Sequence, residues 1–287
     1  MMQLQEYLSQ CAHLKTTPLL KTGVQAALAA GEIIRPLFGN IKDVRHKGRI
    51  DIVTEADIAS EEKIIEVLQS AGPGIRIVSE ETNPSYDALC KGPSWIIDPL
   101  DGTTNFAHGF PWFGISIALA EGDKILTGVI YCPLQDELFC ACLGGGAWLN
   151  GQAIRVSRTP CLEDALLATG FPYDIREDPE GVVGALKAII IKAQGIRRAG
   201  AAALDLAYVA CGRLDGFWEI KLRPWDTAAG KLLIEEAGGR VSVFDGRPYS
   251  PVDAEILATN TLIHPELSVV LKDFSGREKG VTHEHVP

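Results

Sequence analysis

Apolar side chains recur at helical spacing near the start of the chain. Between residues 17 and 38 they fall every three or four positions and stop at Gly39-Asn40, a pair typical of a helix C-cap. A second run with this spacing covers residues 56–70 and stops at Gly72-Pro73-Gly74. The two patterns predict a pair of helices that pack on a core, and a short strand at 75–79 follows them.

The middle of the chain consists mainly of apolar runs of strand length. They lie at 95–97, 113–120, 125–132 and 137–142. Because no helix-length segment separates the last three, they predict an antiparallel sheet. Asn150-Gly151 then predicts a two-residue hairpin turn.

From about residue 164 the pattern alternates between strands and helices. Strands are predicted at 166–168, 216–220, 240–244 and 256–258, and helices at 180–194, 200–211, 226–237 and 265–271. This alternation indicates a layered α/β architecture. We expect two subdomains, residues 1–160 and 161–274, and we expect the polar tail 275–287 to be disordered.

Composition and charge restrict the class of protein. The 287 residues are 46 % hydrophobic and 22 % charged, which is an ordinary globular composition. With 27 Lys and Arg against 37 Asp and Glu, the net charge of −10 argues against a surface for nucleic acid or anionic lipid. The seven cysteines form no CxxC pair, and no apolar run approaches the roughly 18 residues of a membrane span. We therefore expect a cytoplasmic protein with reduced thiols that binds neither membrane nor nucleic acid.

The most informative segment begins where the predicted strand 95–97 ends. Asp98 and Asp101 follow it three residues apart, and Pro99 stiffens the turn between them. Both carboxylates and the carbonyl of Leu100 can therefore converge on a hard cation, which prefers oxygen ligands. The alternative interpretation is an Asp-capped helix that follows an Asx-Pro turn.

The next residues add a possible anion-binding backbone. Gly102 permits close approach of a ligand to the main chain. The amides of Gly102, Thr103 and Thr104 at a helix start can cradle a phosphate oxygen.

Three further acidic groups occur elsewhere in the chain, and each also has a local explanation. Asp57, with Thr54, fits a capping box, Glu80 belongs to a pair of glutamates typical of a solvated face, and Asp226 fits a helix N-cap. Taken together with the Asp98–Asp101 turn, they indicate a metal-dependent phosphatase site.

Several strings of the chain resemble a known family. DIVTEAD, SEET, WIIDPLDGTTNFAHGFPWF and RPWDTAAG are similar to signature elements of the inositol monophosphatase family, in their usual order and approximate spacing. The resemblance extends from about residue 20 to 272 and includes GGGAWLNG and ATGFPYD. It implies a layered α-β-α-β-α sandwich of the inositol monophosphatase and fructose-1,6-bisphosphatase type.

The resemblance also implies a metal site. Glu80, Asp98 and the Leu100 carbonyl would hold a first Mg²⁺, while Asp98, Asp101 and Asp226 would hold a second. A third ion near Glu80 is left open. Without metal these like charges would repel one another, so metal binding is expected to stabilise the protein.

By the same resemblance, Thr103, oriented by Asp57, would help to take a proton from the attacking water. The expected catalytic residues are Glu80, Thr103 and Asp57. The expected substrate-binding residues are Gly102, Thr103, Thr104, Gly200, Ala201, Ala202, Glu219 and Asp226. Lys47 and Asp51 stay outside this set, and Asp205 is interpreted as structural, satisfying the turn or helix that it begins.

The function implied is Mg²⁺-dependent hydrolysis of myo-inositol 1-phosphate and related polyol or sugar monophosphates, by a homodimer of a lithium-sensitive superfamily. Enzymatic alternatives are fructose-1,6-bisphosphatase, adenosine 3′,5′-bisphosphate phosphatase and histidinol phosphatase. Arg197-Arg198, Lys221 and Arg223 flank the expected substrate region, so a second phosphate is not dismissed. The alternative from another class is a mainly regulatory binding protein whose metal site serves stability.

Overall fold

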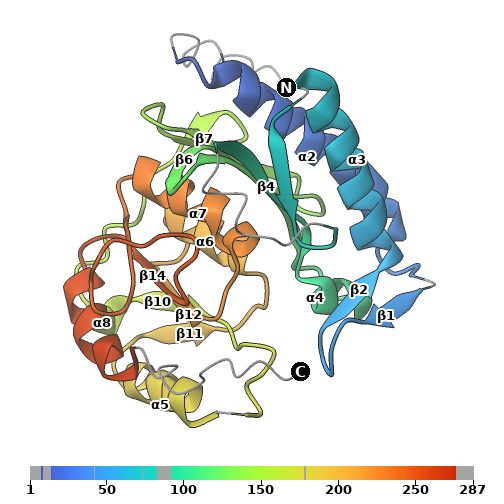
Figure 1. The fold of residues 1–287 in the computed structure, drawn as a ribbon. Helices are drawn as coiled ribbons and strands as arrows, with labels where there is room; N and C mark the ends of the chain where they lie inside the picture. The colour runs from blue at the N-terminus through green and yellow to red at the C-terminus, as the bar shows by residue number, and fades with distance from the viewer. Residues whose placement is uncertain are drawn as a thin grey trace, which may run out of the picture.

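The protein is built from alternating layers of helices and sheets. The computed structural model describes Leu8 and residues 14–41, 43–72, 74–82, 92–177 and 179–275. Within these ranges the order of the layers is a helix pair, a seven-stranded sheet, a second helix pair, a five-stranded sheet and a third helix pair (Figure 1). The predicted α-β-α-β-α sandwich is confirmed. Of the tail predicted to be disordered, residues 276–287 lie outside the described residues, and the subdomain boundary near 160 stays a prediction.

The first outer layer consists of α2 (Thr17–Leu37) and α3 (Glu55–Ala71), as predicted. The two helices pack against each other and against one face of the seven-stranded sheet (Figure 1). Small residues allow this contact to be close. A Cβ atom at Gly31 would come within 2.4 Å of the Tyr131 ring on the sheet, so a larger residue would push α2 away.

The seven-stranded sheet contains the strands predicted between 75 and 142. Its order is β3 (Arg76–Ser79), β4 (Pro93–Asp101), β5 (Gly114–Glu121), β6 (Lys124–Cys132), β7 (Glu137–Cys142), β8 (Ala147–Leu149) and β9 (Gln152–Ala153). All neighbours are antiparallel except β3 and β4, which confirms the predicted antiparallel sheet. Asn150 and Gly151 turn between β8 and β9 with φ of 50° and 81°, so the predicted hairpin is also confirmed.

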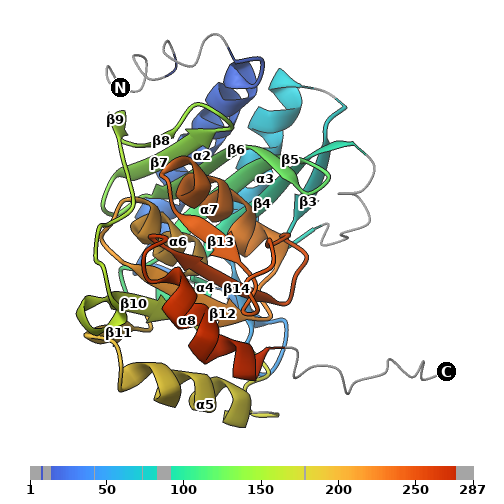
Figure 2. The ribbon, with the colours of Figure 1, turned by 90° about the vertical axis from the view of Figure 1, so that its left-hand side faces the viewer.

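The central layer consists of α6 (Ala202–Ala210) and α7 (Pro224–Glu236), which lie between the two sheets (Figures 1 and 2). A Cβ atom at Gly230 would come within 2.5 Å of Leu206, so the two helices touch almost backbone to backbone. Buried alanine and leucine side chains surround this contact and form the core between the sheets. Both helices begin at the same end of the molecule, where β4 also ends, and this sets the place of the site.

The five-stranded sheet follows on the far side of α6 and α7. Its order is β11 (Gly195–Arg197), β10 (Leu166–Thr169), β12 (Gly216–Ile220), β14 (Glu255–Thr259) and β13 (Arg240–Ser242). Strands 166–168, 216–220 and 256–258 are confirmed, and β13 is shorter than the predicted 240–244. Strand β11 was not predicted, because its three residues carry too short a pattern.

The last layer packs on the outer face of this sheet. It contains α5 (Pro179–Ile190), α8 (His264–Leu271) and the 3₁₀ helix η3 (Lys272–Phe274), side by side in Figures 1 and 2. The predicted helix 180–194 is wrong at its end, since a turn after Ile190 leads directly into β11. The remaining short elements are β1 (Val44–His46), β2 (Ile52–Thr54), α4 (Thr103–Ala107) and the 3₁₀ helix η2 (Leu162–Asp164). Over the described ranges, no helix combines the length and the apolar character that crossing a bilayer requires.

Candidate active site

A charged cleft of about 580 Å³ opens where β4 ends and where α4, α6 and α7 begin. Every predicted metal-binding and substrate-binding residue lines this cleft. They are Glu80, Asp98, Leu100, Asp101, Gly102, Thr103, Thr104, Gly200, Ala201, Ala202, Glu219 and Asp226. Asp57 is the one predicted site residue that does not line the cleft, and it lies behind Thr103.

The turn from Asp98 to Asp101 is fixed by hydrogen bonds at both of its ends. The amide of Leu100 donates to Oδ1 of Asp98 at 3.0 Å, and the hydroxyl of Ser60 on α3 donates to the Pro99 carbonyl at 2.7 Å. The pairing of β4 with β5 shifts register between Asp98 and Asp101, which is a β-bulge. A bulge re-aims side chains at the end of a strand, so both carboxylates turn toward the cleft.

Asp101 joins the two halves of the chain. Its Oδ2 accepts a hydrogen bond from the amide of Ala203, in the first turn of α6, at 2.7 Å. This caps the amide end of that helix with a negative charge, a favourable arrangement. Burial raises the pKa of Asp101 to about 7, even though the amides of α6 oppose the rise.

Gly102 is required where the chain enters α4. Its φ is 92°, and a Cβ atom there would lie 2.9 Å from the carbonyl of Trp112 and 3.3 Å from Cβ of Ala201. Any side chain would therefore separate the start of α4 from the start of α6. The helix start predicted after Gly102 is confirmed, with the amide of Phe106 donating to the Gly102 carbonyl at 3.0 Å.

Thr103 and Asp57 form a buried hydrogen-bonded pair. The hydroxyl of Thr103 donates to Oδ1 of Asp57 at 2.8 Å, across 46 residues of sequence. The other oxygen, Oδ2, accepts from the amide and the hydroxyl of Thr54, at 2.7 and 2.6 Å. The capping-box interpretation and the pairing with Thr103 therefore hold together, one for each oxygen. Burial raises the pKa of Asp57 to about 6.

Asp226 enters the cleft from the first turn of α7. Its Oδ2 accepts from the amide of Arg223 at 2.7 Å, and Arg223 is the N-cap of the helix. The interpretation of Asp226 as the N-cap is wrong. The helix begins two residues earlier, at Pro224, because proline is favoured at the first position of a helix. The hydroxyl of Ser116 on β5 donates to the Trp225 carbonyl at 2.9 Å and ties the helix start to the sheet.

The carboxylates of the cleft influence one another strongly. Burial raises the pKa of Asp98 well above its usual range, and the charges of Glu80, Asp101 and Asp226 add to the rise. Burial, Glu80 and Asp101 do the same to Asp226. These carboxylates cannot all stay charged side by side unless a cation balances them. Mg²⁺ is such a cation and prefers oxygen ligands, so the residues of the cleft fit it.

Lys47 places a positive charge beside these carboxylates. Its ammonium group lies 2.7 Å from Oε1 of Glu80 and 2.9 Å from Oε1 of Glu81. Burial alone would lower the pKa of Lys47, but the two glutamates outweigh it and raise that pKa. As the side chains stand, no three His, Cys, Asp or Glu groups of the described residues are close enough to hold an ion. Binding a metal at Glu80 therefore requires side-chain movement and displacement of Lys47.

The other wall of the cleft is formed by α6 and β12. Gly200 turns into α6 with φ of 87°, and Asn105 on α4 donates to the Ala199 carbonyl at 2.9 Å. Glu219, near the end of β12, packs directly on Gly170, where a Cβ atom would lie 2.1 Å from its carboxylate. Burial raises the pKa of Glu219 well above its usual range, and Asp226 and Asp205 add to the rise.

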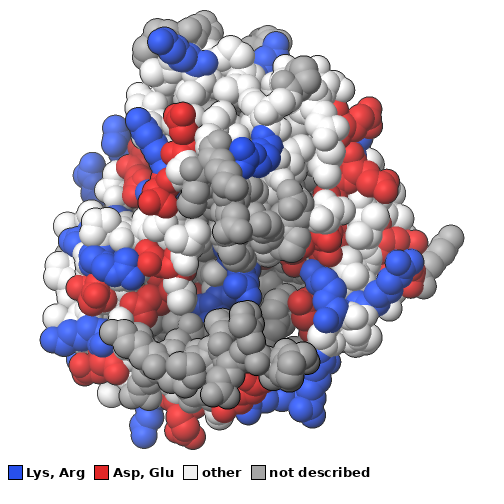
Figure 3. All heavy atoms as spheres, viewed as in Figure 1, with Lys and Arg blue, Asp and Glu red and all other residues white. Residues whose placement is uncertain are grey.

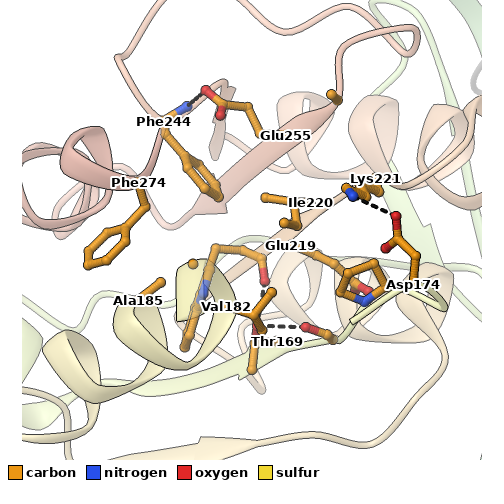
Figure 4. A pocket seen from close by; sticks show the side chains of 15 residues that line it. Thr169, Asp174, Val182, Ala185, Glu219, Ile220, Lys221, Phe244, Glu255 and Phe274 are labelled. Carbon is orange, nitrogen blue, oxygen red and sulfur yellow. Dashed lines mark hydrogen bonds and ion pairs between the residues drawn. The ribbon is translucent and has the colours of Figure 1, made fainter. Parts of the chain in front are cut away.

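A second cavity of about 110 Å³ adjoins this wall (Figure 4). Val182 and Ala185 of α5 lie on one side, and Phe244 and Phe274 lie opposite them. This cavity is mainly apolar and is unsuited to a phosphate.

The face drawn in Figure 3 shows Lys and Arg interspersed with Asp and Glu, without a continuous basic band over the residues described there.

Sequence reasoning missed several residues of the cleft. Asp51 was left outside the predicted set and lines the cleft. Lys47, also left outside that set, follows β1 and contacts Glu80, which lies 33 residues later in the chain. Phe171 and Tyr173 also line the cleft, from the loop after β10. Both lie in the segment ATGFPYD that the resemblance includes, but neither was assigned to the site. Asp205 lines the cleft too, and its signal was visible: a lone charged residue in an otherwise apolar helical run.

Comparisons with known proteins show which family the chain resembles. The model of the inositol monophosphatase family matches residues 15–274. An inositol-1-monophosphatase of Synechocystis is 44 % identical over 253 residues, which cover 88 % of each protein. A Nus factor SuhB of Pseudomonas aeruginosa is 43 % identical over 253 residues, which cover 85 % of this chain and 92 % of the relative.

Solved structures give the same answer for the fold. The inositol monophosphatase of Anabaena superposes with a TM-score of 0.80 at 42 % identity, covering 89 % of this chain and 95 % of that one. The fold and the sequence relatives therefore agree. The chain belongs to the inositol monophosphatase family.

Proposed function

We propose that this protein is a Mg²⁺-dependent phosphomonoesterase that hydrolyses myo-inositol 1-phosphate and related polyol or sugar monophosphates. The observation that carries the proposal is the convergence of Asp98, Asp101 and Asp226 on one cleft with the Thr103–Asp57 pair at its edge. Relatives that bear the name inositol-1-monophosphatase support the choice of substrate class. The proposal includes a cytoplasmic location and a homodimer. Light scattering of the purified protein tests the homodimer.

The proposed metal ligands all line the cleft. Glu80, Asp98 and the Leu100 carbonyl would hold a first Mg²⁺, and Asp98, Asp101 and Asp226 would hold a second, with a third beside Glu80 left open. Mg²⁺ bound there supplies activation of the attacking water and neutralises negative charge on the phosphate and the leaving oxygen.

The residues of the chain then act on protons and orientation. Oγ1 of Thr103 donates to Asp57, which leaves its lone pairs to accept a hydrogen bond from the attacking water. As Thr103 takes the proton of the water, it can pass its own proton to Oδ1 of Asp57, whose pKa of about 6 lies near neutrality. Water that hydrogen-bonds to Asp226 protonates the leaving alkoxide.

Binding of the substrate is divided between two walls. The amides of Gly102, Thr103 and Thr104 face the phosphate from the start of α4. Glu219 and the backbone of residues 200–202 accept and donate hydrogen bonds to the hydroxyl groups of the alcohol. Ala201 has no side-chain hydroxyl, so this wall binds the hydroxyl groups of the alcohol through its backbone and its carboxylates.

The test is phosphate release from myo-inositol 1-phosphate, fructose 1,6-bisphosphate and adenosine 3′,5′-bisphosphate, each with Mg²⁺ and with chelator. Mg²⁺-dependent turnover that prefers inositol phosphate and is lost in Asp98→Asn is the expected result. Preference for a bisphosphate would retain the mechanism and change the substrate, a role for which Arg198 and Arg223 in the cleft are suited. Absence of metal-dependent release from all three would refute the enzyme and favour a regulatory binding protein.

A further inference from the structure

Asp205 is a buried carboxylate without a described hydrogen-bond partner. It lies in the first turns of α6 with 2 % of its surface exposed, and its Oδ1 accepts no hydrogen bond from the described residues. The interpretation of Asp205 as a residue that satisfies the start of the helix is wrong. Asp101 fills that role, since the amide of Ala203 donates to it at 2.7 Å.

Burying such a group disfavours folding. A carboxylate that loses water without gaining donors destabilises the folded state, and burial accordingly raises the pKa of Asp205 well above its usual range. The neighbouring residues of the helix, Leu204, Leu206 and Ala207, are apolar and fully buried. A residue selected for packing alone would be apolar as well, so the carboxylate needs an explanation outside the folded chain.

The position of Asp205 supplies that explanation. It lines the cleft, and it lies three and four residues after Ala202 and Ala201, on the same face of the chain as these predicted substrate-binding residues. Glu219 lines the cleft from β12, which packs against α6, and the charge of Asp205 raises its pKa. Both carboxyl groups therefore face the same cleft from neighbouring elements.

Arg198 is the basic residue whose charge acts on both carboxyl groups of this wall. The charge of Arg198 lowers the pKa of both Asp205 and Glu219, although it does not outweigh their burial. Its guanidinium group lies over the ring of Phe171, 5.2 Å from the ring centre. The wall consequently offers two carboxyl groups as acceptors for hydroxyl hydrogens, and when these groups are ionised their charge repels a second phosphate.

We propose that Asp205 is a specificity-determining residue that, together with Glu219, accepts hydrogen bonds from two hydroxyl groups of the leaving alcohol. The inference rests on the proposed function and deepens it. Polyol monophosphates are the preferred class, because their neighbouring hydroxyls supply two donors. Monophosphates of alcohols without further hydroxyls gain nothing from the pair, and bisphosphates are disfavoured by its charge.

The experiment compares three substrates in two variants. In Asp205→Ala, kcat/KM for myo-inositol 1-phosphate is expected to fall at least about tenfold, the usual effect of losing a hydrogen bond to a charged group. For phenyl phosphate, which has no hydroxyl, kcat/KM is expected to change less than about twofold. In Asp205→Asn, which retains one acceptor oxygen but no charge, activity on fructose 1,6-bisphosphate relative to inositol 1-phosphate is expected to rise.

Thermal unfolding separates this role from a structural one. Both Asp205 variants are expected to unfold at the same temperature as the wild type or higher, because an unpaired buried charge is removed. The matched control is Asp215→Asn, whose carboxylate is also buried but accepts hydrogen bonds from the Leu166 amide and the Ser157 hydroxyl outside the cleft. That variant is expected to unfold at a lower temperature and to keep the wild-type ratio between substrates.

Two results would overturn the inference. One is an equal loss of activity on inositol 1-phosphate and phenyl phosphate in Asp205→Ala, accompanied by a lower unfolding temperature. The other is an unchanged ratio between the three substrates. If the wild-type protein hydrolyses none of the three with Mg²⁺, the proposed function fails first and the inference falls with it, whereas wild-type turnover with unchanged ratios refutes the inference alone.

Discussion

Asp98, Asp101 and Asp226 line the same cleft as Glu219 and Asp205, yet backbone amides donate to the first three and no described residue donates to the other two. We call the first three the amide-held carboxylates and the last two the open carboxylates. The chain fixes the amide-held carboxylates before any ligand arrives. The open carboxylates can therefore accept hydrogen bonds from a ligand that enters the cleft. The proposed metal ligands are thus held by backbone amides, whereas the carboxylates proposed to select the substrate are not.

The largest expected effect follows from removing an amide-held carboxylate. Asp98→Asn keeps the shape and the hydrogen bond from the Leu100 amide but loses a charge shared by both proposed metal sites. Turnover of all substrates should fall by more than about 10²-fold, because even residues outside the ligand shell contribute 10–100-fold. Steady-state kinetics at saturating Mg²⁺ measure the loss. A loss confined to polyol substrates would show that Asp98 acts in selectivity, as proposed for the open carboxylates, and would contradict the distinction between the amide-held and the open carboxylates.

The next effect concerns the proton acceptor beside the amide-held carboxylates. Thr103→Ala removes the hydroxyl that donates to Asp57 and should lower kcat by about 10²- to 10³-fold for every substrate. Thr103→Ser is the matched control, since it keeps the hydroxyl and should keep most of the activity. Equal losses in both variants would mean that the methyl group, and not the hydroxyl, is what matters.

Stability without metal should depend on pH in a definite direction. The pKa values of Asp57 and Asp101, about 6 and about 7, lie above their ordinary value of 3.8, so the folded state binds these protons more tightly than the unfolded state does. The resulting stability is complete below pH 3.8 and is lost as the pH rises through 6 to 7.

The unfolding temperature of metal-free protein should therefore fall between pH 5 and pH 8. The fall should be several degrees, since each of the two groups loses about 1.4 kcal/mol per pH unit up to its pKa, and a loss of about 1 kcal/mol lowers the unfolding temperature by roughly 2–4 °C in a domain of this size. Saturating Mg²⁺ should reverse the trend, because the carboxylates must release protons to bind it. Differential scanning calorimetry in chelator and in Mg²⁺ measures both slopes. A rise with pH in chelator would contradict the pKa shifts.

The smallest expected effect concerns Lys47, which pairs with Glu80 where a metal is proposed to bind. Lys47→Met removes this competing cation and should tighten Mg²⁺ binding about two- to fivefold, as expected for a partly exposed ion pair. Isothermal titration measures the change. Lys63→Met is the matched control, because Lys63 pairs with Glu66 on α3 outside the cleft. Weaker binding in Lys47→Met would show that the ammonium supports the metal.

Much of the fold could be predicted because its elements are long and regular in pattern. Strands such as β5 and β6 bury nearly every side chain and stand out as apolar runs. Strand β1 could not be found in this way, since all three of its residues are exposed and only pairing with β2 makes it a strand. Strand β4 extends to Asp101, beyond the predicted 95–97, because Asp98 and Asp101 are buried in spite of their charge.

The candidate site shows the same limit. Residues in strong local motifs, such as Asp98 and Gly102, could be assigned from the sequence. Lys47 and Asp205 could not, because their roles depend on neighbours that lie far away in the chain. Local patterns reveal what a segment does by itself. A polar residue that contradicts its own pattern, as Asp205 does in α6, is the sign that a distant partner or a ligand decides its role.

The contact between Gly170 and Glu219 has a consequence for sequence variation in the family. A Cβ atom at residue 170 would lie 2.1 Å from the carboxylate of Glu219, so a side chain there would displace this carboxylate from its present place in the cleft. Relatives with a side chain at the position of Gly170 should hold the carboxylate at the position of Glu219 elsewhere or carry a shorter residue there. Such correlated pairs would mark a branch of the family whose cleft has a different wall, and so a different choice of alcohol.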